Sequence, residues 1–296
     1  MRKLLIVVCT LLVTSLNTLS QTCAESAREV KPQLSVEAAK TYEEKLVEAR
    51  AQAQLTPDSA DAVLWLGRRI AYPGDYKEAI EIFSKGSAKF PKDARFYRHR
   101  GHRYITLRCF DDAIADLEKA AKLIKGKPDE VEPDGLPNAQ NIPTSTLQSN
   151  IWYHLGLAYY LKGDFKKALK AYDECVKVSK NPDMLVATVH WLYMTARRSG
   201  NEKKAAKALA LIVGEPQIIE NPDYYRLIKL YQGRQKLRIL RANWARRIRW
   251  GMRRSVMGSG TGTCIADAKR RPERSLRRSL PVTNGRALDL SRLRRS

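Results

Sequence analysis

The sequence predicts an all-α fold in which helical hairpins stack along one axis as a solenoid. Glycines and aromatic residues recur at equal offsets in the middle of the chain, and Gly67 and Gly101 are 34 residues apart. Within each unit the apolar residues lie three and four positions apart, which places them on one helix face. Gly-Asp pairs at 74–75 and 163–164 interrupt this pattern, so each unit divides into two helices.

The first 24 residues have the layout of a secretory signal peptide. Arg2 and Lys3 precede an apolar run from Leu4 to Leu16, and a polar segment follows. Small residues at Thr22 and Ala24 would allow cleavage after Ala24. We therefore expect an exported protein, periplasmic or secreted, whose mature chain starts at residue 25.

Two alternatives stay open at this end of the chain. The apolar run could serve as a permanent anchor, although it is shorter than the roughly 20 residues that a membrane-spanning helix needs. Cys23 could instead carry a lipid, although Ser20 to Thr22 lack the small pair that usually precedes a lipidated cysteine. Lipid anchoring through Cys23 is therefore the weaker expectation.

Composition excludes several classes of protein. The hydrophobic fraction of 44%, with 16 Gly and 13 Pro, is that of a globular protein and not of a collagen-like, wholly disordered or multi-span membrane protein. The five cysteines are scattered without a C-x-x-C pair. The spacing therefore predicts neither a zinc site nor a dense disulfide framework.

Three units share the repeat pattern and span 60–93, 94–127 and 149–182. The third unit carries the pattern most fully, through Trp152, Leu155, Gly156, Tyr159, Ala168 and Tyr172. These offsets resemble the tetratricopeptide repeat, with its W-x2-L-G-x2-Y and A-x3-F pattern. The resemblance implies a right-handed superhelical solenoid of helix-turn-helix hairpins. In this family the first helix of each hairpin lines a concave groove.

Other segments complete the predicted solenoid over 60–233. A degenerate fourth unit spans 186–219, and helical segments at 25–59 and 223–231 have the apolar content of caps, which a solenoid needs to cover its terminal faces. The proline-rich segment 126–148 interrupts the array between the second and third units. It is an inserted loop, which could face a partner from one rim of the solenoid or be mobile and uninvolved.

Residues 234–296 differ in composition from the rest of the chain. They hold 17 Arg and 2 Lys against 3 acidic residues, a net charge of +16, whereas the whole chain carries +23. A basic amphipathic helix along Leu237, Leu240, Trp244, Ile248 and Met252 would suit an anionic membrane surface or an acidic partner. A disordered tail and a reading-frame artefact are the alternatives. Nucleic acid is not an expected partner, because an exported protein rarely meets it.

No residue pattern predicts catalysis, a metal site or a cofactor. The sequence has no G-x-S-x-G elbow and no phosphate-binding G-x-x-x-x-G-K-[ST] loop. His99 and His102 lie one turn apart on one predicted helix, but two imidazoles without a carboxylate are a poor metal site. No histidine is near Cys109 or Cys175 in sequence, so both thiols are expected to be inert or buried in the core.

The resemblance indicates where a partner would bind. The expected groove residues, on the first helices of the three units, are Arg68, Tyr72, Arg95, Arg98, His102, Asn150, Tyr153 and Tyr160. Arginine forks hold carboxylates and tyrosines add contact area, so an acidic peptide or a free C-terminus is the expected ligand, with a solvated helix face as the alternative.

We therefore predict an exported scaffold for protein–protein interaction, without catalysis. The alternative function is a membrane-associated adaptor, attached by the basic tail or by a lipid at Cys23, that recruits a partner through its repeats.

Overall fold

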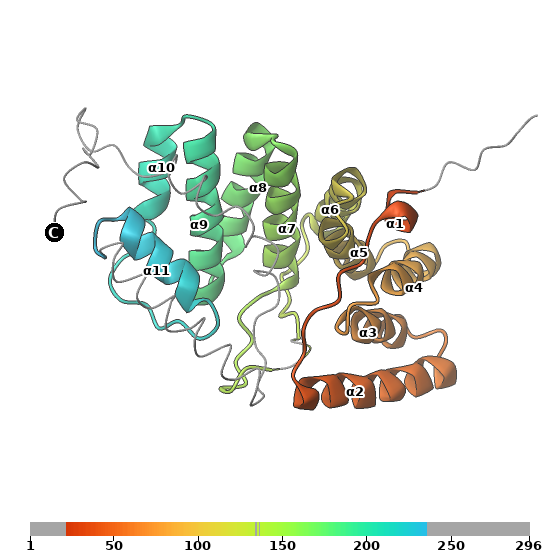
Figure 1. Ribbon diagram of the computed structural model, residues 1–296. Helices are drawn as coiled ribbons and strands as arrows, with labels where there is room; N and C mark the ends of the chain where they lie inside the picture. Colours follow the sequence, from red (N-terminus) through yellow and green to blue (C-terminus); the bar gives the residue numbers. More distant parts are fainter. Residues whose placement is uncertain (1–21, 134, 136, 236–296) are drawn as a thin grey trace, which may run out of the picture.

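The computed structural model describes residues 22–133, 135 and 137–235, and within them it contains eleven helices and no strand (Figure 1). The all-α expectation is confirmed. The helices are α1 (Cys23–Ser26), α2 (Val36–Leu55), α3 (Ala60–Ala71), α4 (Tyr76–Lys89), α5 (Ala94–Thr106), α6 (Phe110–Ile124), α7 (Leu147–Lys162), α8 (Phe165–Val178), α9 (Pro182–Arg198), α10 (Glu202–Leu209) and α11 (Pro222–Tyr231).

Consecutive helices pair as hairpins: α3 with α4, α5 with α6, α7 with α8 and α9 with α10. Each hairpin also packs on the next, because α4 contacts α5, α6 contacts α7 and α8 contacts α9. α2 lies against α3 at one end of the array, and α11 crosses α9 at the other end (Figure 1). The result is the predicted stack, in which each hairpin contacts its neighbours.

Small residues let the two helices of a hairpin approach each other closely. A Cβ added at Gly67 would lie 2.4 Å from the ring of Phe83, and one at Gly156 would lie 2.7 Å from the ring of Tyr172. Phe83 and Tyr172 are fully buried. A large ring on the second helix thus fills the space that the glycine leaves on the first, which closes each hairpin around its own core.

The second hairpin departs from the repeat pattern at two arginines. Arg108 replaces the turn glycine and keeps its left-handed backbone, with φ of 66° against 107° at Gly74. Arg100 replaces an apolar residue, and its guanidinium donates two hydrogen bonds to the buried carboxylate of Asp116, at 2.7 and 2.8 Å. It also donates to Ser84 Oγ at 2.9 Å, so this arginine joins the first two hairpins.

The fourth hairpin begins at Pro182, earlier than the expected Val186, because Asn181 caps α9 and a proline suits the first helical position. The carboxylate of Asp183 is buried in the same turn. It accepts hydrogen bonds from the backbone N–H groups of Ile219, Glu220 and Asn221, at 2.7 to 2.9 Å. The start of α9 therefore holds the segment that leads into α11.

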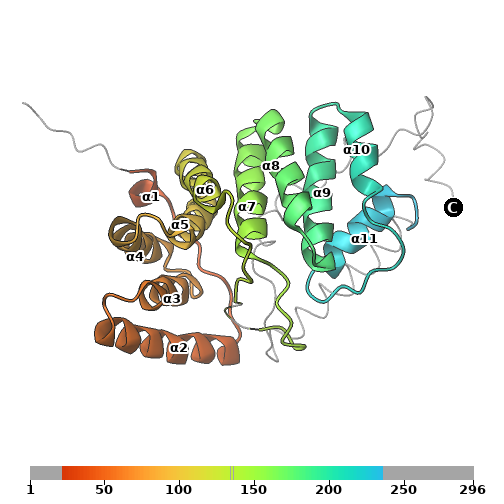
Figure 2. The same cartoon turned by 180° about the vertical axis from the view of Figure 1, so that it is seen from behind.

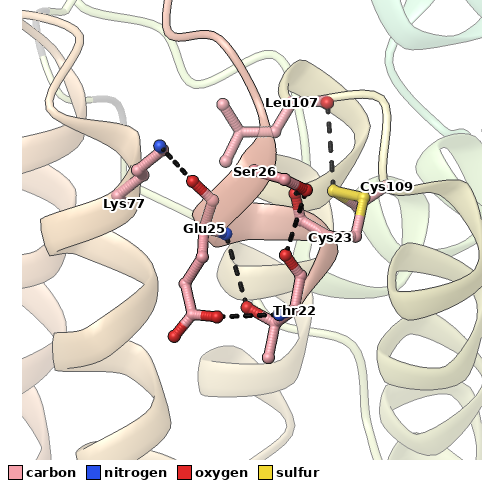
Figure 3. The surroundings of a disulfide bond; sticks show 7 residues. All are labelled: Thr22, Cys23, Glu25, Ser26, Lys77, Leu107 and Cys109. Atoms are coloured by element: carbon pink, nitrogen blue, oxygen red, sulfur yellow. Dashed lines mark hydrogen bonds between the residues drawn. A yellow bond between two sulfur atoms is a disulfide. The ribbon is translucent and has the colours of Figure 1, made fainter. Parts of the chain in front are cut away.

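A disulfide joins the first described residues to the array (Figure 3). Cys23, on α1, is bonded to Cys109, which directly precedes α6. The neighbouring backbone is held as well, because Lys77 Nζ donates to the carbonyl of Glu25 at 2.7 Å and the N–H of Lys77 donates to Glu29 Oε1 at 2.7 Å. The chain before α2 is thereby attached to α4 and to the turn before α6.

This bond bears on three expectations about the cysteines. Cleavage after Ala24 would remove Cys23, so a chain with the bond cannot start at residue 25. The sulfur of Cys23 also cannot carry a lipid while it is bonded to Cys109. Cys109 is buried, as expected, and the bond makes it a structural cysteine. Scattered spacing concealed the pair because 86 residues separate its members, which only the hairpin stack brings together.

We expect Cys23→Ser to lower the free energy of unfolding by about 3 kcal/mol, because the bond closes a long loop and restricts the unfolded chain. Denaturant unfolding of both proteins measures the difference. A thiol reductant should lower the stability of the parent to that of the variant and leave the variant unchanged. Equal stability of the parent with and without reductant would contradict a structural role.

Candidate partner-binding groove

The inserted loop 126–148 folds back across the face that the first helices of the hairpins present. It extends below α7 and lies between α3 and α11 in both views (Figures 1 and 2). On α3, Arg68 Nη2 donates to the carbonyl of Pro133 at 2.6 Å, and Arg69 Nη1 donates to the carbonyl of Gly135 at 2.7 Å. An added Cβ at Gly135 would lie 2.1 Å from Tyr72 Oη, so the loop backbone rests directly on this tyrosine.

The carboxylate of Glu132 enters a buried site between α5 and α7. Oε1 lies 2.9 Å from Arg98 Nη2 and 3.4 Å from His99 Nε2. Oε2 accepts a hydrogen bond of 3.2 Å from Asn150 Nδ2. Arg98, His99 and Asn150 are each less than a tenth exposed, so the first helices of two hairpins form a site for one carboxylate.

The far side of the loop is attached to the other end of the array. Asn138 Nδ2 and Thr144 Oγ1 each donate a hydrogen bond of 2.7 Å to the carboxylate of Glu220. Asp183 holds the backbone of Glu220, so these bonds link the loop to the start of α9. Within the loop, Val131 and Thr146 form an isolated antiparallel bridge. The segment that presents Glu132 is therefore extended and paired.

From the sequence we expected a groove on the first helices, and a loop that either faces a partner from the rim or is mobile and uninvolved. The loop instead covers the predicted groove residues Arg68, Tyr72, Arg98 and Asn150, because its carboxylate neutralises a buried guanidinium and its carbonyls accept from two further arginines. The expectation of an uninvolved loop is wrong for the same reason. The residues predicted to bind an acidic peptide contact an acidic segment of their own chain.

The other predicted groove residues have different surroundings. Arg95 pairs with Asp93 and Asp61, each at 2.6 Å, and contributes nothing to the carboxylate site. The ring of His102 lies 4.1 Å from that of His154, next to the buried arginines. Tyr153 Oη lies 3.3 Å from Tyr224 Oη on α11.

Tyr160 belongs to an aromatic group farther along the face. Its ring meets that of Trp191 edge to face at 5.1 Å, and the guanidinium of Arg198 lies 5.7 Å from its centre. Tyr153 and Tyr160 therefore line the part of the face that α9 and α11 border, apart from the carboxylate site.

Sequence reasoning missed Glu132, which the loop supplies, and Glu220, which holds the loop from the segment before α11. A signal for the first was present. Segment 126–148 contains four acidic residues and one lysine in a chain of strongly positive charge. A proline-rich acidic segment beside helices rich in arginine is expected to lie on them by charge attraction. Nothing local identifies Glu220, because Asp183 positions it across the chain.

Burial sets the ionisation of this region. It lowers the pKa of His99, and the charge of Arg98 lowers it further. Burial also lowers the pKa of His154 to about 3, again with a contribution from Arg98. The pKa of Arg98 is lowered by burial and raised by Glu132. At neutral pH the histidines are uncharged, and the positive charge of the site resides on the arginines.

The remaining cysteine has the surroundings of a core thiol. Cys175 Sγ is buried, 3.1 Å from Thr188 Oγ1, and burial raises the pKa of its thiol to about 11. Within the part of the chain that the structure describes, the one cluster with the proximity of a metal site is Cys23, Cys109 and Asp112, whose two sulfurs are bonded to each other. The same part has no helix that is both long and apolar enough to cross a membrane.

Together, the stacked hairpins and the covered first-helix face define a helical repeat scaffold. A family model of the tetratricopeptide repeat matches residues 149–182, the third of the predicted units. The third hairpin therefore matches the tetratricopeptide repeat, a helical unit that in other proteins forms surfaces for protein or peptide partners. The basic tail expected at 234–296 lies almost wholly outside the described residues, as does the apolar run at the N-terminus.

Comparison with known proteins gives distant similarities. BBSome complex member BBS4 of Bos taurus is 28% identical over 142 residues, which are 48% of this chain and 23% of the relative. The chain thus spans less than a quarter of the curated relative that it matches. Among solved structures, MamA of Desulfovibrio magneticus RS-1 is 19% identical, with a TM-score of 0.44 over 58% of this chain and 84% of MamA. YrrB, described as a TPR protein with an unusual peptide-binding site, is 15% identical, with a TM-score of 0.42 over 55% of this chain and 71% of YrrB.

We expect Glu132→Ala to lower the free energy of unfolding by about 3 kcal/mol, because it leaves the guanidinium of Arg98 buried without its carboxylate. Combining Arg98→Met with Glu132→Leu removes both charges and should cost less than Glu132→Ala alone. Denaturant unfolding of the parent and these variants measures both values. If the double variant is instead the less stable of the two, the coupling between the charges is absent.

The buried histidines predict that stability falls in acid. Burial lowers the pKa of His154 and of His190 to about 3, below the unfolded value near 6.5, so the unfolded chain binds more protons as the pH drops. Each histidine should cost about 2 kcal/mol at pH 5 relative to pH 7.5. The loss begins near pH 6.5 and continues to about pH 3. Denaturant unfolding at each pH measures it.

His190→Leu provides the control for this pH dependence. It removes one titrating group, so its stability should fall less steeply between pH 7 and 5 than that of the parent. An unchanged slope would show that His190 does not titrate as its burial implies.

Proposed function

We propose that this protein is an exported scaffold, without catalysis, that binds an extended acidic segment of a partner protein on its first-helix face. The observation that supports it is the buried site of Glu132, where Arg98, His99 and Asn150 surround one carboxylate. The scaffold already accommodates an extended acidic segment there. A partner with the same chemistry would take the place of the loop.

The chemistry of the face favours an acid over a neutral or basic peptide. A guanidinium that is already buried has lost its water, so a carboxylate opposite it gains a strong charge-assisted hydrogen bond. A neutral peptide would leave Arg98 without a counter-charge, which is costly in a buried site. Arg68 and Arg69 add donors for backbone carbonyls, as they do for Pro133 and Gly135. Together these groups recognise an extended backbone with an acidic side chain.

Export is supported by the disulfide, because such bonds persist in oxidising compartments and are rare in the cytosol. The chain with this bond must keep Cys23, so we place signal cleavage before it. A cut after Ser20 would have Thr18 and Ser20 as the small residues at the two recognition positions. The N-terminal residue of the exported protein distinguishes the two cuts. It is Gln21 after a cut at Ser20 and Glu25 after a cut at Ala24.

A membrane-associated adaptor is the alternative function. Of its two attachments, the lipid at Cys23 conflicts with the disulfide. The remaining attachment is the basic segment that starts near Leu237, and it stays a prediction from sequence. No contact among the described residues favours it.

A peptide with the sequence of residues 127–133, Lys-Pro-Asp-Glu-Val-Glu-Pro, tests the proposed groove. The loop of the parent chain competes for the site, so we expect the labelled peptide to bind the full chain with Glu132→Gln about tenfold more tightly than the parent. Fluorescence anisotropy measures both affinities.

Two controls keep this result specific. Glu130→Gln makes the same change at an exposed side chain of the same loop and should leave binding at the parent level. A peptide in which glutamine replaces the residue that corresponds to Glu132 should lose most of its affinity for the Glu132→Gln chain. Equal binding to the two variants, or equal binding of the two peptides, would refute the carboxylate site.

A further inference from the structure

A second groove lies between the second and third hairpins, and the start of the inserted loop, Gly126 and Lys127, lines part of it. Its volume is about 1150 Å³, and α6, α7 and α8 form its walls. The carboxylate site described above uses the first helices α5 and α7. This groove instead opens between the second helices α6 and α8, with α7 at its base, so it is a separate surface.

The groove has the shape of a trough for one helix. The residues of α7 that line it are Gln148, Trp152, Leu155 and Tyr159. They are spaced three and four apart and so form one stripe along about three turns, roughly 16 Å. The lining residues of α8 follow the same spacing. On the side of α6 the lining residues include Glu118, Ala121, Lys122 and Lys125, again three and four apart. A further helix between these three stripes would pack as helices do in a bundle.

The base of this trough is apolar and its rims are basic. Trp152 is partly exposed and lies beside Leu155. Exposed lysines line both rims, with Lys122, Lys125 and Lys127 on the side of α6 and Lys170 on the side of α8. Apolar surface flanked by charge is the pattern that an amphipathic helix recognises.

The positive charge of the rims is unbalanced. Of the acidic residues that line the groove, Glu118 accepts from Tyr159 Oη, Asp173 pairs with Lys204, and Glu174 pairs with Lys177. Among the described residues, the four lysines named above form no ion pair. Glu118 keeps its negative charge, because its partner is a neutral hydroxyl. The four lysines less this one carboxylate leave about three unbalanced positive charges, and the arginine-rich segment of the same chain would be repelled.

We propose that the α6–α8 groove binds an amphipathic α-helix of a partner protein, with a stripe of apolar residues toward Trp152 and Leu155 and acidic residues on both flanks. This site is formed by other residues than the carboxylate site of Glu132. A partner could occupy both surfaces, or two partners could bind at once.

A designed peptide of about three turns, with leucines on one face and glutamates on both flanks, tests this site. We compare the full chain with the triple variant Lys122→Glu, Lys125→Glu and Lys170→Glu. The matched control reverses three exposed lysines elsewhere, Lys85→Glu, Lys92→Glu and Lys207→Glu. The whole chain is used throughout, so attraction to the arginine-rich segment is equal in all three proteins.

We expect the groove variant to bind the peptide at least about tenfold more weakly than the control variant, as measured by fluorescence anisotropy. Equal affinity of the two variants would overturn the proposal, because the peptide would then respond to the net charge of the protein and not to the lysines of the groove. Failure of the peptide to bind the parent would overturn it too. The peptide with the sequence of residues 127–133 binds the other site, so either result leaves the test of the carboxylate site unchanged. The two proposals can therefore fail separately.

Two other occupants are separate outcomes of the same comparison. Anionic lipid vesicles that sediment with the control variant but not with the groove variant, while the helix peptide does not bind, would assign the groove to a membrane and overturn the proposal. Self-association of the parent that the groove variant abolishes, seen by sedimentation velocity, would assign it to a second copy of the chain and also overturn it.

Discussion

A guanidinium removed from water needs a carboxylate close to it, and this requirement at Arg98 organises the functional face of the protein. Glu132 supplies the carboxylate from the loop between the second and third hairpins. Because Arg98 is on α5 and Asn150 is on α7, the same carboxylate also connects two hairpins that the loop separates in sequence. The loop is consequently part of the packed structure, and the groove that it crosses already holds an acidic segment.

The self-occupied groove changes how binding should be understood. In the proposed function a partner does not meet an empty surface, since it would have to compete with a segment tethered to the same chain, which has a high effective concentration. Such competition weakens every ligand and penalises most those that lack a carboxylate for Arg98. The loop would therefore act as a filter for acidic partners as well as a structural element. The α6–α8 groove has no such internal ligand among the described residues, so the two surfaces differ in the threshold for binding.

The ends of the array are stabilised by different means. At one end α2 packs on α3, and the segment before it is attached by the disulfide between Cys23 and Cys109. At the other end the carboxylate of Asp183 accepts three backbone hydrogen bonds and so positions α11 against α9. A solenoid must cover its terminal apolar faces. At the first end α2 covers the terminal face, whereas the disulfide holds α1, most of which is exposed, against the turn before α6.

The sequence by itself determined the repeat and the hairpin, because these follow from neighbours in the chain. Gly67 and Gly156, with a ring one helix later at Phe83 and Tyr172, specify close helix packing wherever they occur. It also determined that arginines and tyrosines gather on the first helices. The tertiary structure alone decided that Cys23 meets Cys109, that Glu132 reaches Arg98 and that Glu220 holds the far side of the loop. Each of these contacts joins residues more than 30 positions apart in the chain, and local spacing has no information about which distant charges or thiols the stack brings together.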